Sequence, residues 1–467
     1  MRFEKKNIII VLFVVGSLLR ILLCSSSPTG NAFDNHYTPI SIIMETGEIA
    51  AKDACPQCYH PPVFYLVSAV IGKIVLGTGL DVRYVMKLIQ FSCCLYGILT
   101  LYVIYLILSK MNISDFSRAI AFGTVCFLPR HIYMSAMNSN DAISYLFVSL
   151  CVYLMLLLLE TNLKYKYQVM LSVAVIVAVF IKYTCYILLP AFAVLSLLLL
   201  KSKEFPRKKL ISFALLSYGL PALLLCGYSL YNYNTYGTFL PDNVAAASIL
   251  KQPQDPGGVN FFTFKPWLSI QNPFLAPGKL GSFWTLIYSS TWYDIDAMFI
   301  RFFDNKESLW EPYYDWLKGY VAFPDPRLIV PHYASNMGAV LVTLGLMPLC
   351  FTVLGFFIAV KNSFYSYTKK NEQSLSEWYK TPLFIMLALF NIALIVAFTV
   401  KRPFYSSIKS SYILNALPAY AIFLSFGIMS LRKFLDNKYI AIFFGSIFIF
   451  VIIHINYIVY HIGIFNY

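Results

Sequence analysis

The chain has 467 residues, of which 59% are hydrophobic, 17% are aromatic and only 12% are charged. Soluble domains carry about 25% charged residues, so this composition excludes a soluble protein and predicts an integral membrane protein. The net charge of +14 would suggest a nucleic-acid partner in a soluble protein. Here Lys and Arg cluster in short loops between apolar runs, where they are typical of topology signals and of contacts with membrane lipids. We therefore expect no nucleic-acid partner.

Apolar runs long enough to form helices recur along the whole chain. A segment inside a bilayer has to satisfy its own backbone hydrogen bonds, so runs of this length predict α-helices rather than a barrel of alternating strands. Residues 8–24 follow Arg2, Lys5 and Lys6 and resemble a signal peptide, but no small-residue cleavage motif follows, so we interpret them as the first transmembrane helix. We expect an all-α integral membrane protein, a multispanning helical bundle with helices near residues 8–24, 62–78, 86–108, 117–134, 142–159, 168–181, 184–200, 210–230, 336–360, 381–400, 412–430 and 439–460.

The run at 62–78 is an exception, because its crossing would put later basic loops on the wrong side of the membrane. Cytoplasmic loops are enriched in Lys and Arg. The basic loops of this chain are the N-terminus and residues 110–118, 164–166, 201–209, 361–380 and 432–438. Residues 62–78 are short for a crossing, follow His60-Pro61 and contain Lys73, so we interpret them as an interfacial or re-entrant helix. About eleven spanning helices then remain, with the N-terminus inside and the C-terminus outside.

This topology gathers the remaining polar segments on the outer face. They are residues 31–62, 81–87, 130–141, 182–183, 231–336 and 401–412. The chain then divides into a transmembrane module at 1–230, which includes a first outer loop at 25–85, an outer loop region at 231–335 and C-terminal transmembrane helices at 336–467. The middle region is rich in aromatic residues, which indicates an ordered loop region rather than a linker.

Ionisable residues are concentrated in the first outer loop, and such residues beside a bilayer usually serve chemistry or ion binding. Asp34 lies in this loop, and Asp141 lies at the outer end of another helix. Either acid could simply cap a helix. If both face one cleft, they could take the proton of an attacking nucleophile and orient that nucleophile, which is general-base chemistry. The candidates for substrate binding are the polar residues nearby: His36, Tyr37, His60, Asn138 and Asn140.

Basic residues on the outer face are unexpected under the positive-inside rule. Lys182 and Lys409 each lie at the mouth of an apolar helix, where a charge needs a partner. A phosphate group held at the membrane surface is a suitable partner. The candidates for binding it are Lys182, Arg402, Lys409 and Arg83.

Cys55 and Cys58 form a CxxC motif, with His60 two residues further on. Together with His36 they could bind a metal ion, but a single CxxC motif is weak evidence for a zinc site. On an oxidising outer face a local disulfide is the favoured interpretation. We assign no metal ligand, and the need for a divalent cation as cofactor stays open. Hydrolase triads and glycine-rich phosphate loops are absent from the sequence.

The order of several motifs resembles that of a known class of enzymes. An acid followed by HY opens the first loop, which closes with YHPPVFYL; VRYVMKLI, SNDAISYLFVSL, KYTCYILLP and KSSYILNALP follow in that order. This order is similar to bacterial members of the GT-C class, which includes the protein O-mannosyltransferases and the lipid A aminoarabinose transferases. The resemblance covers most of residues 1–200 and about 400–420. It implies a multispanning glycosyltransferase that uses a polyprenyl-phosphate sugar donor and folds its first outer loop into juxtamembrane helices.

The resemblance also implies roles for individual residues. Asp34 would be the catalytic base and Asp141 the second acid of the cleft, and the juxtamembrane helix would start at residues 60–62. The donor phosphate would meet Lys182, Arg402 and Lys409. The sequence departs from many relatives at Asn35, where those relatives carry a second acid beside the first. Residues 231–336 match no motif of the class.

We therefore expect inverting transfer of a single sugar from a polyprenyl phosphate to an acceptor glycan, lipid or protein on the outer face, most simply of a bacterial inner membrane. Three alternatives stay open. An oligosaccharide transferase or ligase would use a lipid-pyrophosphate donor. A transporter of lipid-linked sugars would need acids or broken helices at mid-membrane depth. A non-catalytic assembly subunit would leave the two acids without a purpose.

Overall fold

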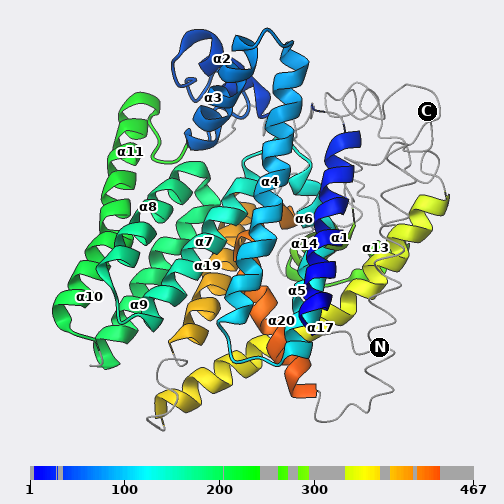
Figure 1. Ribbon diagram of the computed structural model, residues 1–467, viewed down its shortest axis with the longest axis vertical. Helices are drawn as coiled ribbons and strands as arrows, with labels where there is room; N and C mark the ends of the chain where they lie inside the picture. Colours follow the sequence, from blue (N-terminus) through cyan, green and yellow to red (C-terminus); the bar gives the residue numbers. More distant parts are fainter. Residues whose placement is uncertain are drawn as a thin grey trace.

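The computed structural model describes residues 5–27, 29, 35–202, 205–241, 261–271, 282–293, 332–368, 379–402 and 408–431. Within these residues the chain forms helices and no strands, which confirms the expected all-α fold (Figure 1). Eight helical segments among them are long and apolar enough to cross a membrane: 7–26, 82–109, 141–160, 183–201, 207–236, 338–365, 380–401 and 410–431. The expected helix at 439–460 lies outside the described residues, so the expected count of about eleven is not established.

The N-terminal half supplies the centre of the bundle. Helix α1 (Lys5–Ser26) packs against α4 (Val82–Ser109), and α4 packs against α7 (Asp141–Glu160). Helix α8 (Tyr165–Ile181) turns through the 3-10 segment η1 (Tyr183–Ile187) into α9 (Leu188–Ser202). The next segment joins α10 (Arg207–Ala214), the π-helical turn η2 (Leu215–Gly219) and α11 (Leu220–Tyr236).

The expected single helix at 117–134 is wrong, because the structure divides it into two. Helix α5 (Asp115–Cys126) ends before Leu128, and α6 (Pro129–Ser135) begins at the next residue. A residue that precedes proline is pushed out of the helical region of backbone space. Leu128 accordingly adopts an extended conformation, with φ −66° and ψ 113°, and Pro129 opens the new helix, where its missing N–H is not needed.

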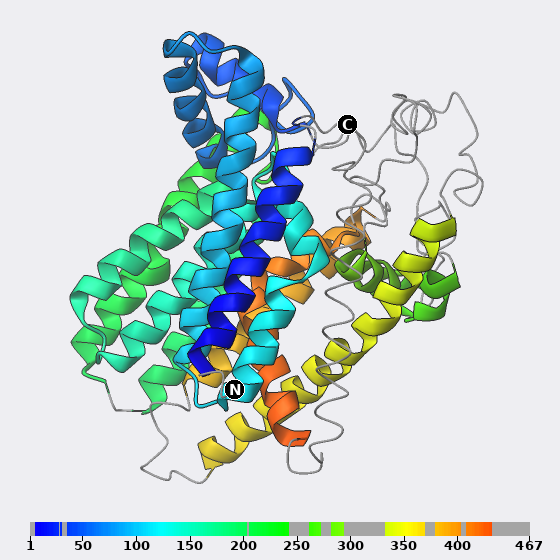
Figure 2. The same cartoon turned by 45° about the vertical axis from the view of Figure 1, so that its right-hand side comes forward.

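The C-terminal part completes the bundle. Helix α17 (His332–Thr368) runs obliquely beside α20 (Leu417–Leu431), as Figure 2 shows. Between them in sequence lie α19 (Lys380–Lys401) and the 3-10 segment η6 (Ser410–Ala416). Most of the expected outer loop region at 231–335 lies outside the described residues. Two of its described stretches are helical: α13 (Pro266–Gln271) and α14 (Phe283–Trp292), of which α14 is largely buried and packs against α6 and η6.

One end of the bundle is formed by basic loops that ion pairs hold together. Glu160 at the end of α7 accepts from Lys110 Nζ at 2.7 Å and from Lys380 Nζ at 3.1 Å. Lys209 Nζ donates to the backbone oxygen of Asn162 at 2.9 Å. The loops that the positive-inside rule assigns to one side are therefore neighbours in the structure, at what we call the basic-loop end.

The opposite end carries the first outer loop, and we call it the first-loop end. Lys87 Nζ donates to the backbone oxygens of Cys24 at 2.6 Å and Ser27 at 3.0 Å, so a positive charge lies where the carbonyls of α1 end. Asn138 Nδ2 donates to the backbone oxygen of Thr29 at 2.9 Å. The loop before α7 therefore lies beside the start of the first outer loop, which is the arrangement that the helix count predicts.

Helices α2 (Tyr37–Thr46) and α3 (Val63–Gly77) pack together at this end of the bundle (Figures 1 and 2). A 15-residue helix at a rise of about 1.5 Å per residue is shorter than the bilayer core, which is about 30 Å thick. The short α3 and its place above the bundle agree with the interpretation that residues 62–78 do not cross the membrane.

The orientation of the bundle leads to a labelling prediction. Glu48 in the first loop and Lys166 at the basic-loop end are both exposed. With the exposed Cys226 and Cys350 changed to serine, a membrane-impermeant maleimide added to intact cells should label a Glu48→Cys variant. It should label a Lys166→Cys variant only after the cells are permeabilised, because the positive-inside rule places the basic loops in the cytoplasm. Labelling of both variants from the same side would contradict this topology.

Candidate active site

A buried ion pair lies at the first-loop end of the bundle. Asp141 occupies the first turn of α7, where the helix dipole favours a carboxylate. Lys182 joins α8 to η1 in an extended conformation, with φ −157° and ψ 142°. Its Nζ lies 2.7 Å from Asp141 Oδ1, and each side chain is only 4% exposed. Charges so far from water need a partner, so each of these residues supplies the counter-charge of the other.

The ion pair is surrounded by aromatic side chains from two elements. The Tyr145 hydroxyl, one turn along α7 from Asp141, contacts Asp141 Oδ1 at 3.1 Å and the backbone oxygen of Ser411 at 2.7 Å. Lys182 Nζ lies 5.4 Å from the centre of the Tyr412 ring. A cation over an aromatic face is attracted by the ring quadrupole. The segment η6 therefore covers the ion pair and is bonded to it.

The side-chain amide of Asn415 hydrogen-bonds η6 to both α7 and η1. Ser144 Oγ donates to Asn415 Oδ1 at 3.0 Å, and Asn415 Nδ2 donates to Thr184 Oγ1 at 2.5 Å. On the other side, Asn391 Nδ2 of α19 donates to the backbone oxygen of Tyr412 at 3.2 Å. Three motifs far apart in sequence, SNDAISYLFVSL, KYTCYILLP and KSSYILNALP, thus meet at one place. There the polar side chains of the three motifs hydrogen-bond to one another.

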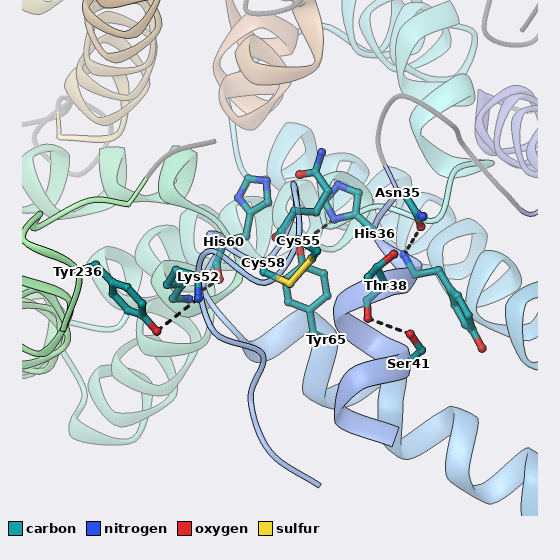
Figure 3. Close-up of a disulfide and its surroundings, with 12 residues drawn as sticks. Asn35, His36, Thr38, Ser41, Lys52, Cys55, Cys58, His60, Tyr65 and Tyr236 are labelled. Carbon is teal, nitrogen blue, oxygen red and sulfur yellow. Dashed lines mark hydrogen bonds between the residues drawn. A yellow bond between two sulfur atoms is a disulfide. The ribbon is translucent and has the colours of Figure 1, made fainter. Parts of the chain in front are cut away.

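The first outer loop contains a local disulfide between Cys55 and Cys58, as Figure 3 shows. This confirms the favoured interpretation of the CxxC motif, and it leaves neither sulfur as a thiolate for a metal. Within the described residues, no three His, Cys, Asp or Glu side chains gather in a way that could hold a metal ion. The residues of the loop core stack instead. The rings of His36 and His60 lie 5.5 Å apart, and His36 Nδ1 lies 2.8 Å from the Tyr65 hydroxyl.

The disulfide loop is bonded to the bundle beside the ion pair. The hydroxyl of Tyr183, the residue after Lys182, donates to the backbone oxygen of Tyr59 at 2.8 Å. Lys52 Nζ donates to the backbone oxygen of His60 at 2.8 Å, and the Lys52 N–H donates to the Tyr236 hydroxyl at 3.3 Å (Figure 3). The first outer loop therefore reaches α11 on one side and η1 on the other.

Burial of Lys52 makes the stability of this contact dependent on pH. Burial lowers the pKa of Lys52 from 10.5 to about 8. Between these two pH values the Lys52 side chain carries a proton in the unfolded chain but not in the folded one. The free energy of unfolding of the protein therefore rises with pH in this window. We expect the melting temperature of the wild type, relative to that of Lys52→Met, to increase as pH is raised from about 8 to 10.5. Identical pH dependence of both proteins, followed by circular dichroism, would contradict this expectation.

The candidate catalytic base, Asp34, lies outside the described residues, between Thr29 and Asn35. The remaining candidates for substrate binding lie close to the groups above. Tyr37 opens α2 and is half-buried, and its pKa is raised by burial and by the nearby Glu45 carboxylate. Asn138 and Asn140 lie in the three residues before Asp141 and are buried.

The candidate phosphate ligands fall into two groups. Arg83 is 85% exposed and bonded to Asp81, the residue that caps its own helix, so it does not belong to the cluster around the ion pair. Lys409 is half-buried and immediately precedes η6. Arg402 is half-buried and directly follows α19 as its C-cap residue. Lys182 differs from the expectation because its nearest charge is the carboxylate of Asp141.

Arg20 and His131 form a second buried polar contact that the sequence interpretation missed. Arg20 lies in α1 and is fully buried; Nη1 donates to the backbone oxygen of Cys126 at 2.8 Å, and Nη2 lies 2.6 Å from His131 Nδ1. Cys126 is the last residue of α5, so Arg20 satisfies a carbonyl that the helix break leaves free. A single arginine inside the apolar run at 8–24 was the available signal.

The sequence matches no protein-family model and no curated protein. Solved structures do match. The oligosaccharyltransferase of Archaeoglobus fulgidus, in complex with Zn and sulfate, has a TM-score of 0.50 and 12% identity, over 95% of this chain and 52% of that one. AglB of the same organism, in complex with an inhibitory peptide and a dolichol-phosphate, has a TM-score of 0.47 and 13% identity, over 98% and 55%. ArnT of Cupriavidus metallidurans, bound to undecaprenyl phosphate, has a TM-score of 0.37 and 15% identity, over 91% of this chain and 78% of that one.

The chain spans about half the length of the archaeal oligosaccharyltransferase that it matches. At this identity the likeness concerns the fold, and it includes nearly the whole of the present chain. The chain therefore has the fold of the GT-C membrane glycosyltransferases, which the order of its motifs predicted.

Proposed function

We propose that the protein transfers a single sugar from a polyprenyl phosphate to an acceptor, with inversion, at the first-loop end of the bundle. One observation carries the proposal: the buried pair of Asp141 and Lys182 lies where η6, η1 and the start of α7 meet. Buried, hydrogen-bonded charges in a membrane protein mark a functional site by default. The GT-C fold supports glycosyl transfer as the class of reaction.

The chemistry needs a base, an acceptor and a charge for the leaving group. The acceptor O–H or N–H attacks the anomeric carbon, the bond from that carbon to the phosphate oxygen breaks, and the electron pair leaves with the polyprenyl phosphate. Asp34 takes the proton of the acceptor as general base. Cations stabilise the negative charge that develops on the phosphate, and Arg402, which follows α19, and Lys409, which precedes η6, are the candidates.

Asp141 has a different role in this proposal from that of a second base. Its Oδ1 already contacts Lys182 Nζ and the Tyr145 hydroxyl. These two contacts hold the carboxylate in place, and the ammonium group is its counter-charge. We assign to Asp141 the fixing of Lys182, whose positive charge then faces the position of the donor headgroup.

The fold match favours a second candidate. An oligosaccharide transferase would share the fold but would move a whole glycan from a lipid pyrophosphate, as the likeness to the archaeal oligosaccharyltransferase suggests. The two reactions differ in the mass added to the acceptor and in the lipid product.

Reconstitution distinguishes the candidates. Purified protein in liposomes should be given undecaprenyl phosphate that carries one labelled sugar, together with an envelope extract as acceptor, and the products analysed by mass spectrometry. We expect release of undecaprenyl phosphate and an acceptor that is heavier by one sugar residue. In a parallel assay with a glycan on undecaprenyl pyrophosphate as donor, transfer of the whole glycan to the acceptor with release of undecaprenyl pyrophosphate would favour the oligosaccharide transferase. Movement of the labelled lipid across the bilayer without a covalent product would favour a transporter.

A further inference from the structure

The side-chain amide of Asn140 is fully buried, yet neither of its polar atoms has a hydrogen-bond partner within the described part of the chain. Asn140 is the residue before α7, and its backbone oxygen accepts from the Ser144 N–H at 3.2 Å, as the residue before a helix should. Its side chain makes no capping bond. The backbone of Asn140 therefore serves the fold, while its amide does not.

Asn138, two residues earlier, shows the contrast. Its Nδ2 donates to the backbone oxygens of Thr29 at 2.9 Å and of Met86 at 3.2 Å, so this amide joins the first outer loop to α4 and to the loop before α7. A buried polar group without a partner destabilises a fold, and native proteins keep few of them. The amide of Asn140 thus calls for a partner that is not part of the folded chain.

Within the described ranges, two other buried groups without a hydrogen-bond partner belong to residues near Tyr145, the tyrosine that contacts Asp141. His131 Nε2 and Ser410 Oγ are buried and without a partner among the described residues. The His131 ring lies 5.7 Å from the ring of Tyr145, and Ser410 precedes Ser411, whose backbone oxygen contacts the Tyr145 hydroxyl. Asn140, His131 and Ser410 are therefore each near Tyr145 or Asp141, through sequence or through the contacts of Tyr145.

The chemistry of these groups indicates the kind of ligand. A phosphate oxygen only accepts hydrogen bonds, and an amide oxygen beside it would repel it. A hydroxyl group both donates and accepts, so two neighbouring hydroxyls can pair with an amide N–H and an amide C=O at once. The carboxylate of Asp141 next in the chain further disfavours an anion. A sugar ring, which carries such neighbouring hydroxyls, fits the open groups.

We propose that Asn140 binds the sugar of the lipid-linked donor, with Nδ2 donating to one hydroxyl and Oδ1 accepting from another. This inference rests on the proposed function and adds a specificity-determining residue to it. Asn140 then decides which sugar the protein accepts, while the cations hold the phosphate common to all such donors.

Asn140→Leu tests the inference, because leucine has nearly the shape of asparagine and no polar atoms. Since the amide makes no bond in the fold, the variant should keep the melting temperature of the wild type. The probes are undecaprenyl phosphate without a sugar and undecaprenyl phosphates that carry mannose, glucose, galactose or arabinose. We expect the wild type to bind one of the sugar-bearing lipids more tightly than the sugar-free lipid, and Asn140→Leu to lose about 10- to 100-fold of affinity for that lipid alone.

Asn138→Leu is the matched control, since it removes an amide that makes two bonds in the fold; its melting temperature should fall. A comparable fall for Asn140→Leu would show that the Asn140 amide serves the fold and would overturn the inference. Retention of the wild-type sugar preference by Asn140→Leu would also overturn it, while leaving the proposed function intact. If no sugar-bearing lipid binds the wild type more tightly than undecaprenyl phosphate itself, both the inference and the proposed single-sugar donor fail.

Discussion

Replacing Lys182 by methionine is expected to lower the free energy of unfolding by about 3–5 kcal/mol, because the change leaves the carboxylate of Asp141 buried without a counter-charge. Both side chains of the pair are 4% exposed, so water cannot take the place of the missing ammonium group. Asp141→Asn should have an effect of the same kind, since it leaves the ammonium of Lys182 unpaired. Unfolding in detergent micelles, followed by circular dichroism as a denaturing detergent is added, measures both.

The double variant Asp141→Asn and Lys182→Met provides the control for this prediction. Removing both charges together should recover much of the loss, because no isolated charge then stays buried. The pair of Arg83 and Asp81 offers a surface comparison: Arg83 is 85% exposed, and its replacement by alanine should change stability little. A Lys182→Met variant that is as stable as Arg83→Ala would show that the buried pair does not exist in the folded protein.

Replacing Asp34 by asparagine is expected to slow transfer by about 10²–10⁴-fold, which is the usual contribution of a general base. Asparagine keeps the shape of aspartate but cannot take a proton from the acceptor. Binding of undecaprenyl phosphate and the melting temperature should stay at their wild-type values, since the change removes a proton acceptor and not a phosphate ligand. The measurement is the initial rate of single-sugar transfer under saturating donor.

Asp53→Asn serves as the matched control, because Asp53 is an exposed acid of the same loop. It should transfer sugar at the wild-type rate. Transfer by Asp34→Asn at the rate of Asp53→Asn would remove Asp34 from the mechanism. Loss of donor binding in Asp34→Asn would instead assign that residue to substrate binding.

Much of the architecture could be predicted because it follows from local physics. The first helix, the separate short helix α3 and the grouping of the basic loops follow from apolar length and from the placement of Lys and Arg. The disulfide follows from the spacing of Cys55 and Cys58 and from the expected oxidising side. The division of residues 117–134 was missed, although Pro129 carries the signal, because hydropathy alone does not register a backbone break.

The partners of the charges could not be predicted in the same way. Lys182 was expected to meet a phosphate and Asp141 to face an acceptor, whereas in the structure the two residues meet each other. They are distant in sequence, and only the folding of α8 against α7 brings them together. The burial of α14 was missed for a similar reason: a ten-residue helix is too short for an apolar-run criterion, although it packs in the bundle beside η6.

In the proposed reaction the donor headgroup binds at the first-loop end, beside the buried ion pair. A structure of the protein in nanodiscs with undecaprenyl phosphate tests it most directly. We predict density for the phosphate within hydrogen-bonding distance of Lys409, Arg402 or Lys182, next to η6. A phosphate bound instead at the opposite end, beside Lys110 and Lys380, would contradict the account.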